Sequence, residues 1–235
     1  MVDRDAERCQ RRAGLAAPVK RVGLLGGSFN PAHGAHRRIS LFARRALGLD
    51  EVWWLVSPGN PLKSQAGMAP LAARVKAAQK LAARAPITVT AIERRLDTRF
   101  TIDTLRKLRR RYPRVRFVWL MGADNLAQFH RWKQWRAIAR EMPIAVIARP
   151  GYDAAALASP AMAWLRRFRV PAAGLRNRGE WSAPALVELR FDPDPRSATE
   201  MRRADPHWAR RFTGATPRDR LTHFLVRDRQ EGERA

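Results

Sequence analysis

The chain has very little cysteine and no long apolar run. Cys9 is the only cysteine among 235 residues, so no intramolecular disulfide can form and no zinc site can be built from several thiolates. No stretch approaches the roughly 20 apolar residues that a membrane-spanning helix needs. The first residues also lack the uninterrupted apolar segment of a secretory signal. We therefore expect a cytoplasmic protein whose residues 1–19 form a flexible basic extension.

Negative charge is scarce as well. The chain carries 46 Lys and Arg against 21 Asp and Glu, which gives a net charge of +25. Such a field attracts polyanions and steers anionic ligands toward the surface. Only six of the basic residues are lysine, and Ala, Arg and Pro are plentiful together, as is typical of a GC-rich coding sequence. Because the basic residues lack the aromatic interleaving of an RNA-recognition motif, we expect no specific nucleic-acid partner.

What the chain does have is a regular alternation of apolar runs and amphipathic segments. This alternation predicts βαβ units, and hence an α/β fold with a doubly wound, mainly parallel sheet covered by helices on both faces. We expect one domain over residues 20–227, with a small C-terminal helical part at about 197–227 and a tail at 228–235. The expected strands are residues 22–26, 51–56, 87–92, 115–121, 144–148 and 186–191, and the expected helices are 36–47, 69–84, 101–111, 123–129, 132–140, 153–168, 197–204 and 217–226.

A glycine-rich turn with two histidines follows the first expected strand, from Gly26 to His36 (GGSFNPAHGAH). We expect Gly26 and Gly27 to adopt positive φ and to let the backbone approach a bulky ligand. A helix that begins near His33 presents free N–H groups and a partial positive charge, which favour a phosphate. Because His33 and His36 are three residues apart, both imidazoles can lie on one helix face and point at the same phosphate.

Two common alternatives fit this turn poorly. It departs from the G-x-G-x-x-G pattern of dinucleotide-binding turns. No third nitrogen, sulfur or carboxylate ligand lies nearby in the sequence, so we expect no zinc site there. The turn therefore predicts a phosphate site for a nucleotide.

A second candidate phosphate site lies near the C-terminus, at residues 197–202 (SATEMR). Ser197 is a credible helix N-cap, and Glu200, three residues later, completes a capping box. A well-capped surface helix is one interpretation. The other is that the helix N-terminus, together with Arg202, binds a phosphate.

The two motifs together resemble the HxGH nucleotidyltransferases, whose sheet is Rossmann-like. Within that superfamily, residues from about 21 to 226 are similar to the bacterial nicotinate-nucleotide adenylyltransferases. Three further segments share the resemblance: residues 57–63 (SPGNPLK), 100–105 (FTIDTL) and 122–132 (GADNLAQFHRW). One departure is visible, because the family usually has glycine where this chain has Ala35.

The resemblance implies a set of ligand-binding residues. It places Trp132 against the nicotinate ring and Asp124 beside the nucleotide, and it puts Lys63 near the phosphates. The implied ATP-binding residues are Gly26, Gly27, Ser28, Phe29, His33, His36, Gly122, Asp124, Ser197, Thr199 and Arg202. The implied mononucleotide-binding residues are Asn60, Lys63, Thr101, Asp124, Trp132 and Arg149.

The implied reaction transfers AMP from ATP to nicotinic acid mononucleotide and releases pyrophosphate. The attacking phosphate oxygen is already ionised at neutral pH, so no general base is required. Catalysis should come from in-line positioning and from stabilising charge on the phosphates. We assign His36 to the α-phosphate, His33 to orienting the phosphates, and Lys63 and Arg202 to the β/γ end. Mg²⁺ is expected, held mainly by the ATP phosphates and water.

Other functions remain open at this level. The histidine motif alone does not separate this enzyme from nucleotidyltransferases acting on nicotinamide mononucleotide, phosphopantetheine or a polyol phosphate. The net charge motivates a third hypothesis, a non-catalytic nucleic-acid-binding protein that keeps the fold. The sequence does not indicate an oligomeric state.

Overall fold

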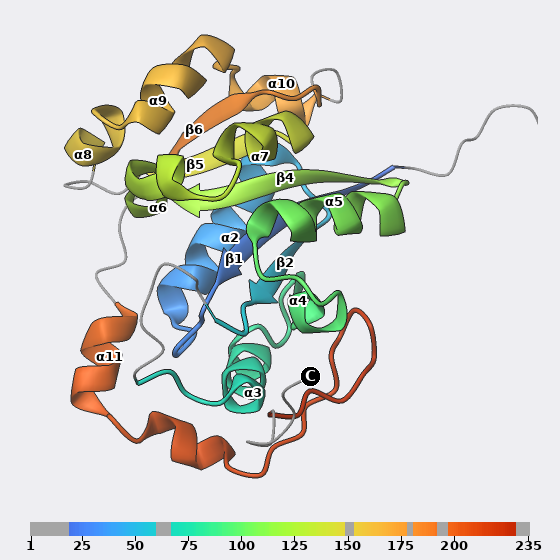
Figure 1. Cartoon of the computed structure of the whole chain (residues 1–235), viewed down its shortest axis with the longest axis vertical. Helices are drawn as coiled ribbons and strands as arrows, with labels where there is room; N and C mark the ends of the chain where they lie inside the picture. The colour runs from blue at the N-terminus through green and yellow to red at the C-terminus, as the bar shows by residue number, and fades with distance from the viewer. Residues whose placement is uncertain (1–18, 60–66, 149–152, 178–180, 192–196, 229–235) are drawn as a thin grey trace, which may run out of the picture.

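A six-stranded parallel sheet forms the centre of the molecule (Figure 1). The computed structural model describes residues 19–59, 67–148, 153–177, 181–191 and 197–228. The strand order is β3-β2-β1-β4-β5-β6 and every neighbouring pair is parallel. The strands are β1 (Lys20–Gly27), β2 (Glu51–Val56), β3 (Ile87–Thr90), β4 (Val115–Gly122), β5 (Ile144–Ala148) and β6 (Leu186–Arg190). The predicted Rossmann-like, doubly wound sheet is confirmed.

Helices cover both faces of this sheet, as the sequence predicts. In β2, Val52 and Trp54 enter one core, whereas Trp53 and Leu55 enter the other. The first core contains α2 (Gly34–Leu47), α3 (Leu71–Leu81) and α10 (Ala172–Arg176). The second contains α4 (Ile92–Arg95), α5 (Thr101–Arg111), α6 (Ala123–Gln128), α7 (Trp135–Glu141), α8 (Asp153–Leu157) and α9 (Pro160–Leu165). None of the helices in the described ranges is both long and apolar enough to cross a bilayer.

The strand order locates the functional edge of the sheet. From β1 the chain adds β2 and β3 on one side, and then returns to add β4, β5 and β6 on the other. Ligands of such sheets bind beyond the carboxyl ends of the strands where this order reverses. That point lies between β1 and β4, where Gly27 and Gly122 end their strands. The predicted glycine-histidine turn begins there.

The C-terminal part folds back past α3 (Figure 1). It consists of α11 (Ala198–Ala204), the 3₁₀ helix η3 (Trp208–Phe212) and an irregular segment that follows. Two more 3₁₀ turns, η1 (Phe129–Arg131) and η2 (Arg166–Phe168), extend helices of the second core. The predicted division into residues 1–19, 20–227 and 228–235 stays a prediction, since most of both tails lies outside the described residues.

The predicted helix at residues 217–226 is wrong. The buried Asp219 carboxylate accepts the backbone N–H groups of Leu221 (2.9 Å) and Thr222 (2.8 Å). Its other oxygen accepts the N–H of Ala91, at the carboxyl end of β3, at 2.6 Å. Local bonds from an aspartate to nearby N–H groups compete with helical hydrogen bonds, and here they form a turn. The prediction failed because the partner of Asp219 is distant in the sequence.

The Trp119 ring packs against Gly26 and leaves no room for a side chain there. A Cβ added at Gly26 would lie 2.6 Å from the indole ring of Trp119, which is 3% exposed and has little room to move. We expect Gly26→Ala to lower the free energy of unfolding by about 1–3 kcal/mol, as overpacking does. Gly27→Ala is the matched control, because its Cβ would make only an ordinary 3.6 Å contact with Phe29. Equal stability of the two variants in urea denaturation would contradict this.

Candidate active site

The two histidines of the motif lie together at the start of α2. His33 is the N-cap and His36 is the third residue of the helix. Their ring centroids are 4.0 Å apart, which confirms that both imidazoles share one helix face. The backbone N–H of His33 donates to Nδ1 of His36 at 3.2 Å. A neutral imidazole that accepts at Nδ1 carries its proton on Nε2, so Nε2 of His36 is an N–H donor.

Aromatic packing holds the His36 ring. The centroid of Phe29 lies 4.8 Å from that of His36 and 5.1 Å from that of Trp54. Trp54 comes from β2 and its indole N–H donates to Ser40 Oγ on α2 at 2.8 Å. His36 is therefore oriented by two rings that are themselves buried. Ala35, at the position where the family usually has glycine, is 1% exposed, so its methyl group is accommodated by the protein's own packing.

The predicted positive φ of the glycines is wrong. Neither Gly26 nor Gly27 has positive φ, and Phe29 has it instead, at +48°. A bulky residue in the left-handed region is strained by about 1–3 kcal/mol and persists only where its surroundings enforce it. Here the enforcing contacts are those of the Phe29 ring with Trp54 and His36. The turn is therefore shaped by the aromatic core under it and not by glycine.

The second motif contacts the first directly. Ser197 caps α11 and forms the predicted capping box with Glu200, through bonds of 3.1 and 3.2 Å. On the same helix, Arg202 donates from Nη1 to the backbone carbonyl of Asn30 at 2.6 Å, across 172 residues of sequence. Its Nη2 donates to Thr199 Oγ1 at 3.2 Å. The Arg202 guanidinium and the two histidines thus belong to one cluster.

Asn30 joins this cluster to a third segment, and our sequence reasoning missed it. We name residues 28–33 the histidine loop, and we name residues 57–59 and 67–70, the described parts of the connection from β2 to α3, the β2–α3 loop. The amide of Asn30, 6% exposed, donates to the carbonyl of Gly67 at 3.0 Å and accepts the N–H of Ala69 at 3.3 Å. The signal available in the sequence was an amide side chain, which both donates and accepts, between the apolar Phe29 and Pro31.

Arg74, on α3, also connects the two loops and was also missed. It is 1% exposed. Its guanidinium donates to the carbonyls of Ser28 (2.7 Å), Ser57 (2.7 Å), Pro58 (3.2 Å) and Ala69 (2.8 Å). Burial lowers the pKa of Arg74 to about 10, and the attraction of Asp228 opposes that change, so the side chain stays charged at neutral pH. A lone arginine between the apolar residues that open α3 was the only signal in the sequence.

The carboxyl end of β4 contributes the predicted Gly122 and Asp124. Asp124 is exposed, and its carboxylate lies so close to Gly122 that a Cβ there would collide with it. Trp132 is partly buried and meets the rings of Phe129 (5.3 Å, 73°) and Trp119 (6.2 Å, 80°) edge-on. Since Trp119 also lies against Gly26, the Trp132 ring is linked by packing to the end of β1.

The remaining predicted residues are placed less closely. Thr101 is the first residue of α5, where Phe100 is the N-cap and no side chain caps the helix. Asp103, two residues later, pairs with Lys133 at 3.3 Å. The roles of Thr101 and Asp124 toward a ligand stay predictions. Asn60, Lys63 and Arg149 lie outside the described residues.

A partly buried carboxyl group lies beside the β2–α3 loop. Burial raises the pKa of Glu93, on α4, to about 7, although hydrogen bonds with Ser57 and Thr104 favour its charged form. Between its ordinary value of 4.5 and about 7, the folded protein therefore binds more protons at Glu93 than the unfolded chain does. The contribution of this group to stability is present at low pH and is lost as the pH rises to about 7.

Glu93→Gln tests this titration. Because glutamine does not ionise, the variant should gain stability relative to the wild type as the pH rises from 5 to 8, with most of the change complete near pH 7. The measurement is urea denaturation at unit pH steps. Glu188→Gln, at an exposed position, is the matched control. A difference between Glu93→Gln and wild type that does not vary with pH would refute the assignment.

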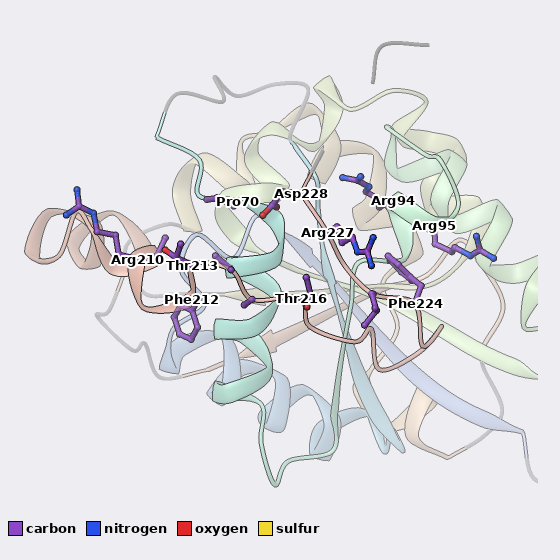
Figure 2. A pocket seen from close by; sticks show the side chains of 15 residues that line it. Pro70, Arg94, Arg95, Arg210, Phe212, Thr213, Thr216, Phe224, Arg227 and Asp228 are labelled. Carbon is purple, nitrogen blue, oxygen red and sulfur yellow. The ribbon is translucent and has the colours of Figure 1, made fainter. Parts of the chain in front are cut away.

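A cavity of about 940 Å³ lies elsewhere, between the start of α3, α4 and the C-terminal segment (Figure 2). Arginines from α4 (Arg94, Arg95) and from the C-terminal segment (Arg227) line it together with Phe224. No residue of the predicted ATP or mononucleotide sets lines this cavity. The candidate active site is therefore the cluster at the β1–β4 edge and not this cavity.

The sequence is similar to those of known proteins. Residues 24–204 match the family model described as cytidylyltransferase-like. A protein of Erythrobacter litoralis (strain HTCC2594), named "Probable nicotinate-nucleotide adenylyltransferase", is 70% identical over 206 residues, covering 88% of this chain and 94% of the relative. One from Bradyrhizobium sp. (strain ORS 278), with the same name, is 52% identical over 188 residues and covers 80% and 98%.

A solved structure has the same fold. It is the Plasmodium falciparum nicotinic acid mononucleotide adenylyltransferase complexed with NaAD, with a TM-score of 0.59 at 16% identity, over 78% of this chain and 83% of that one. At this identity the likeness concerns the fold alone.

Proposed function

The chain belongs to the cytidylyltransferase-like family and, within it, to the nicotinate-nucleotide adenylyltransferases, and from this premise we propose how its residues act. The enzyme transfers AMP from ATP to nicotinic acid mononucleotide and gives deamido-NAD and pyrophosphate, a step of NAD biosynthesis. The observation that carries the residue assignment is the bond from Arg202 to the Asn30 carbonyl, because it brings α11 onto the histidine loop, which ends at His33 and leads into His36 on α2.

We propose that the histidine loop and α11 bind the ATP phosphates together. The N–H at Nε2 of His36 donates to the α-phosphate, where negative charge is redistributed in the transition state. His33 orients the same phosphates from the N-cap position. Arg202, whose guanidinium has more N–H groups than its bonds to Asn30 and Thr199 use, neutralises the β/γ end, together with Lys63. The backbone of Gly26 to Phe29 and the α11 turn with Ser197 and Thr199 complete this half of the site.

The chemical step needs no proton transfer from the protein. A phosphate oxygen of the mononucleotide forms a bond to the α-phosphorus of ATP, and the bond from that phosphorus to the bridging oxygen breaks. The bond electrons leave with pyrophosphate. What the chain supplies is an in-line arrangement and preorganised donors around the phosphorus. The buried rings that fix His36 favour such preorganisation.

We propose that Mg²⁺ accompanies ATP. Mg²⁺ commonly keeps several waters and binds substrate phosphates, where it neutralises charge. The described part of the chain has no group of three or more His, Cys, Asp or Glu side chains arranged to hold a metal. The Asp124 carboxylate is exposed and lies in the first turn of α6, directly after β4. This arrangement fits an ion carried by the phosphates.

The mononucleotide is assigned to the β2 and β4 side of the cluster. We propose that Trp132 presents its partly exposed ring to the nicotinate, while Thr101 and Asp124 contact the nucleotide. Asn60, Lys63 and Arg149 complete this proposed set. Its support is the packing of Trp132 against Trp119, which in turn lies against Gly26 at the end of β1.

The activity is tested by pyrophosphate release from ATP and Mg²⁺ with one acceptor at a time. We expect the highest kcat/KM with nicotinic acid mononucleotide, and lower values with nicotinamide mononucleotide and phosphopantetheine. A preference for phosphopantetheine would overturn the substrate assignment. Absence of release with all three acceptors would overturn the enzymatic function.

A further inference from the structure

Arg74 is a charged residue that the proposed mechanism does not use. It is nearly inaccessible to solvent and its acceptors are all backbone carbonyls. Among the described residues it forms no ion pair within 4 Å. Burying a charge whose direct hydrogen-bond acceptors are all neutral carbonyls is expensive even with the attraction of Asp228, and packing could be achieved by an apolar side chain of similar volume. The carbonyls that Arg74 binds therefore indicate its role.

Those carbonyls come from the two loops of the active site. Ser28 belongs to the histidine loop, and Ser57 with Pro58 opens the β2–α3 loop. A single nitrogen, Nη1, donates to both Ser28 and Ser57 at 2.7 Å, so this one atom sets the separation of the two backbones. The bond from Nε to Ala69 anchors the guanidinium to the other end of the β2–α3 loop. At least four of the five N–H groups of the side chain are used in this way.

We propose that Arg74 is a positioning residue for adenylyl transfer. It fixes the distance between the histidine loop and the β2–α3 loop, and thereby the in-line approach of the mononucleotide phosphate to the α-phosphorus, without touching either substrate. This proposal rests on the proposed function, in which these loops bind the ATP phosphates and the mononucleotide. The guanidinium binds four carbonyls from three nitrogens, whereas an ammonium has three N–H groups on a single nitrogen, so lysine should not replace it.

The first test is Arg74→Ala with chemical rescue. We expect kcat to fall by about 10²-fold, as a misplacement of about 1 Å does. Guanidinium ion at low millimolar concentration should occupy the vacated position and raise kcat of the variant, whereas ammonium should not. A residue that only supports the fold would not give a rescue that distinguishes these two cations. Equal rescue by both, or an unchanged kcat in the folded variant, would overturn the proposal.

The second test is Arg74→Lys, which keeps the charge and decides the question if the alanine variant does not fold. We expect a folded protein with lower kcat, because an ammonium has three N–H groups on one nitrogen and cannot reach the four carbonyls that the guanidinium binds from three nitrogens. Arg44→Lys is the matched control, since Arg44 also donates to a backbone carbonyl, that of Asp50, at 3.1 Å, but touches neither loop. Wild-type kcat in Arg74→Lys would overturn the proposal. Failure of the proposed function appears in the wild type itself, whereas failure of this proposal appears only in the variants.

Discussion

His36→Ala is expected to lower kcat by about 10²- to 10³-fold, or about 3–4 kcal/mol in the barrier, the effect of losing one preorganised donor to a developing charge. The ring is held by Phe29 and Trp54, and its Nδ1 is occupied by the N–H of His33. The ring is therefore held in place before ATP binds, and we assign its Nε2–H to the α-phosphate. The measurement is kcat for pyrophosphate release at saturating ATP and nicotinic acid mononucleotide.

His207→Ala is the control for this prediction. His207 is exposed and lies at the start of η3, outside the cluster. Its removal should leave kcat close to the wild-type value. If His36→Ala turned over at a near-normal rate while remaining folded by circular dichroism, the assignment of His36 to the transition state would be wrong.

Arg202→Ala is expected to lower kcat/KM for ATP by about 10- to 100-fold, which corresponds to the roughly 1.5–3 kcal/mol of a hydrogen bond to a charged group. Two effects contribute. The variant loses a positive charge near the proposed β/γ phosphates. It also loses the bond to the Asn30 carbonyl that brings α11 onto the histidine loop. The measurement is the ATP dependence of pyrophosphate release.

Arg203→Ala provides a matched comparison for Arg202→Ala. Arg203 is the next residue of the same helix and is exposed. Arg203→Ala removes one positive charge from the same short helix as Arg202→Ala does, so any general effect of net charge on ATP binding appears in both variants. Equal losses in the two variants would show that the Asn30 contact has no special role and would remove Arg202 from the proposed site.

Some failures of the sequence predictions share a cause. The helix expected at residues 217–226 has suitable local periodicity, but the buried carboxylate of Asp219 bonds to Ala91, which is distant in the sequence. The positive φ expected of Gly26 and Gly27 occurs at Phe29, where ring packing against Trp54 enforces it. In both cases a contact between distant segments overrides the local preference of the residues.

The alternation of strands and helices, and with it the parallel sheet, could be predicted from the residue pattern. The same pattern predicted the capping box of Ser197 and Glu200 and the shared helix face of His33 and His36. These features depend on the spacing of residues within one strand or helix, and hydrophobic periodicity and capping chemistry describe such spacing well.

The residues that connect the active-site loops could be identified only from the folded protein. Asn30 and Arg74 bind backbone carbonyls and N–H groups of segments that become neighbours once the strand order is set. A backbone carbonyl is present at every residue, so no pattern of side chains marks in advance which one a buried guanidinium will reach. The partners of these two residues are therefore a property of the folded sheet.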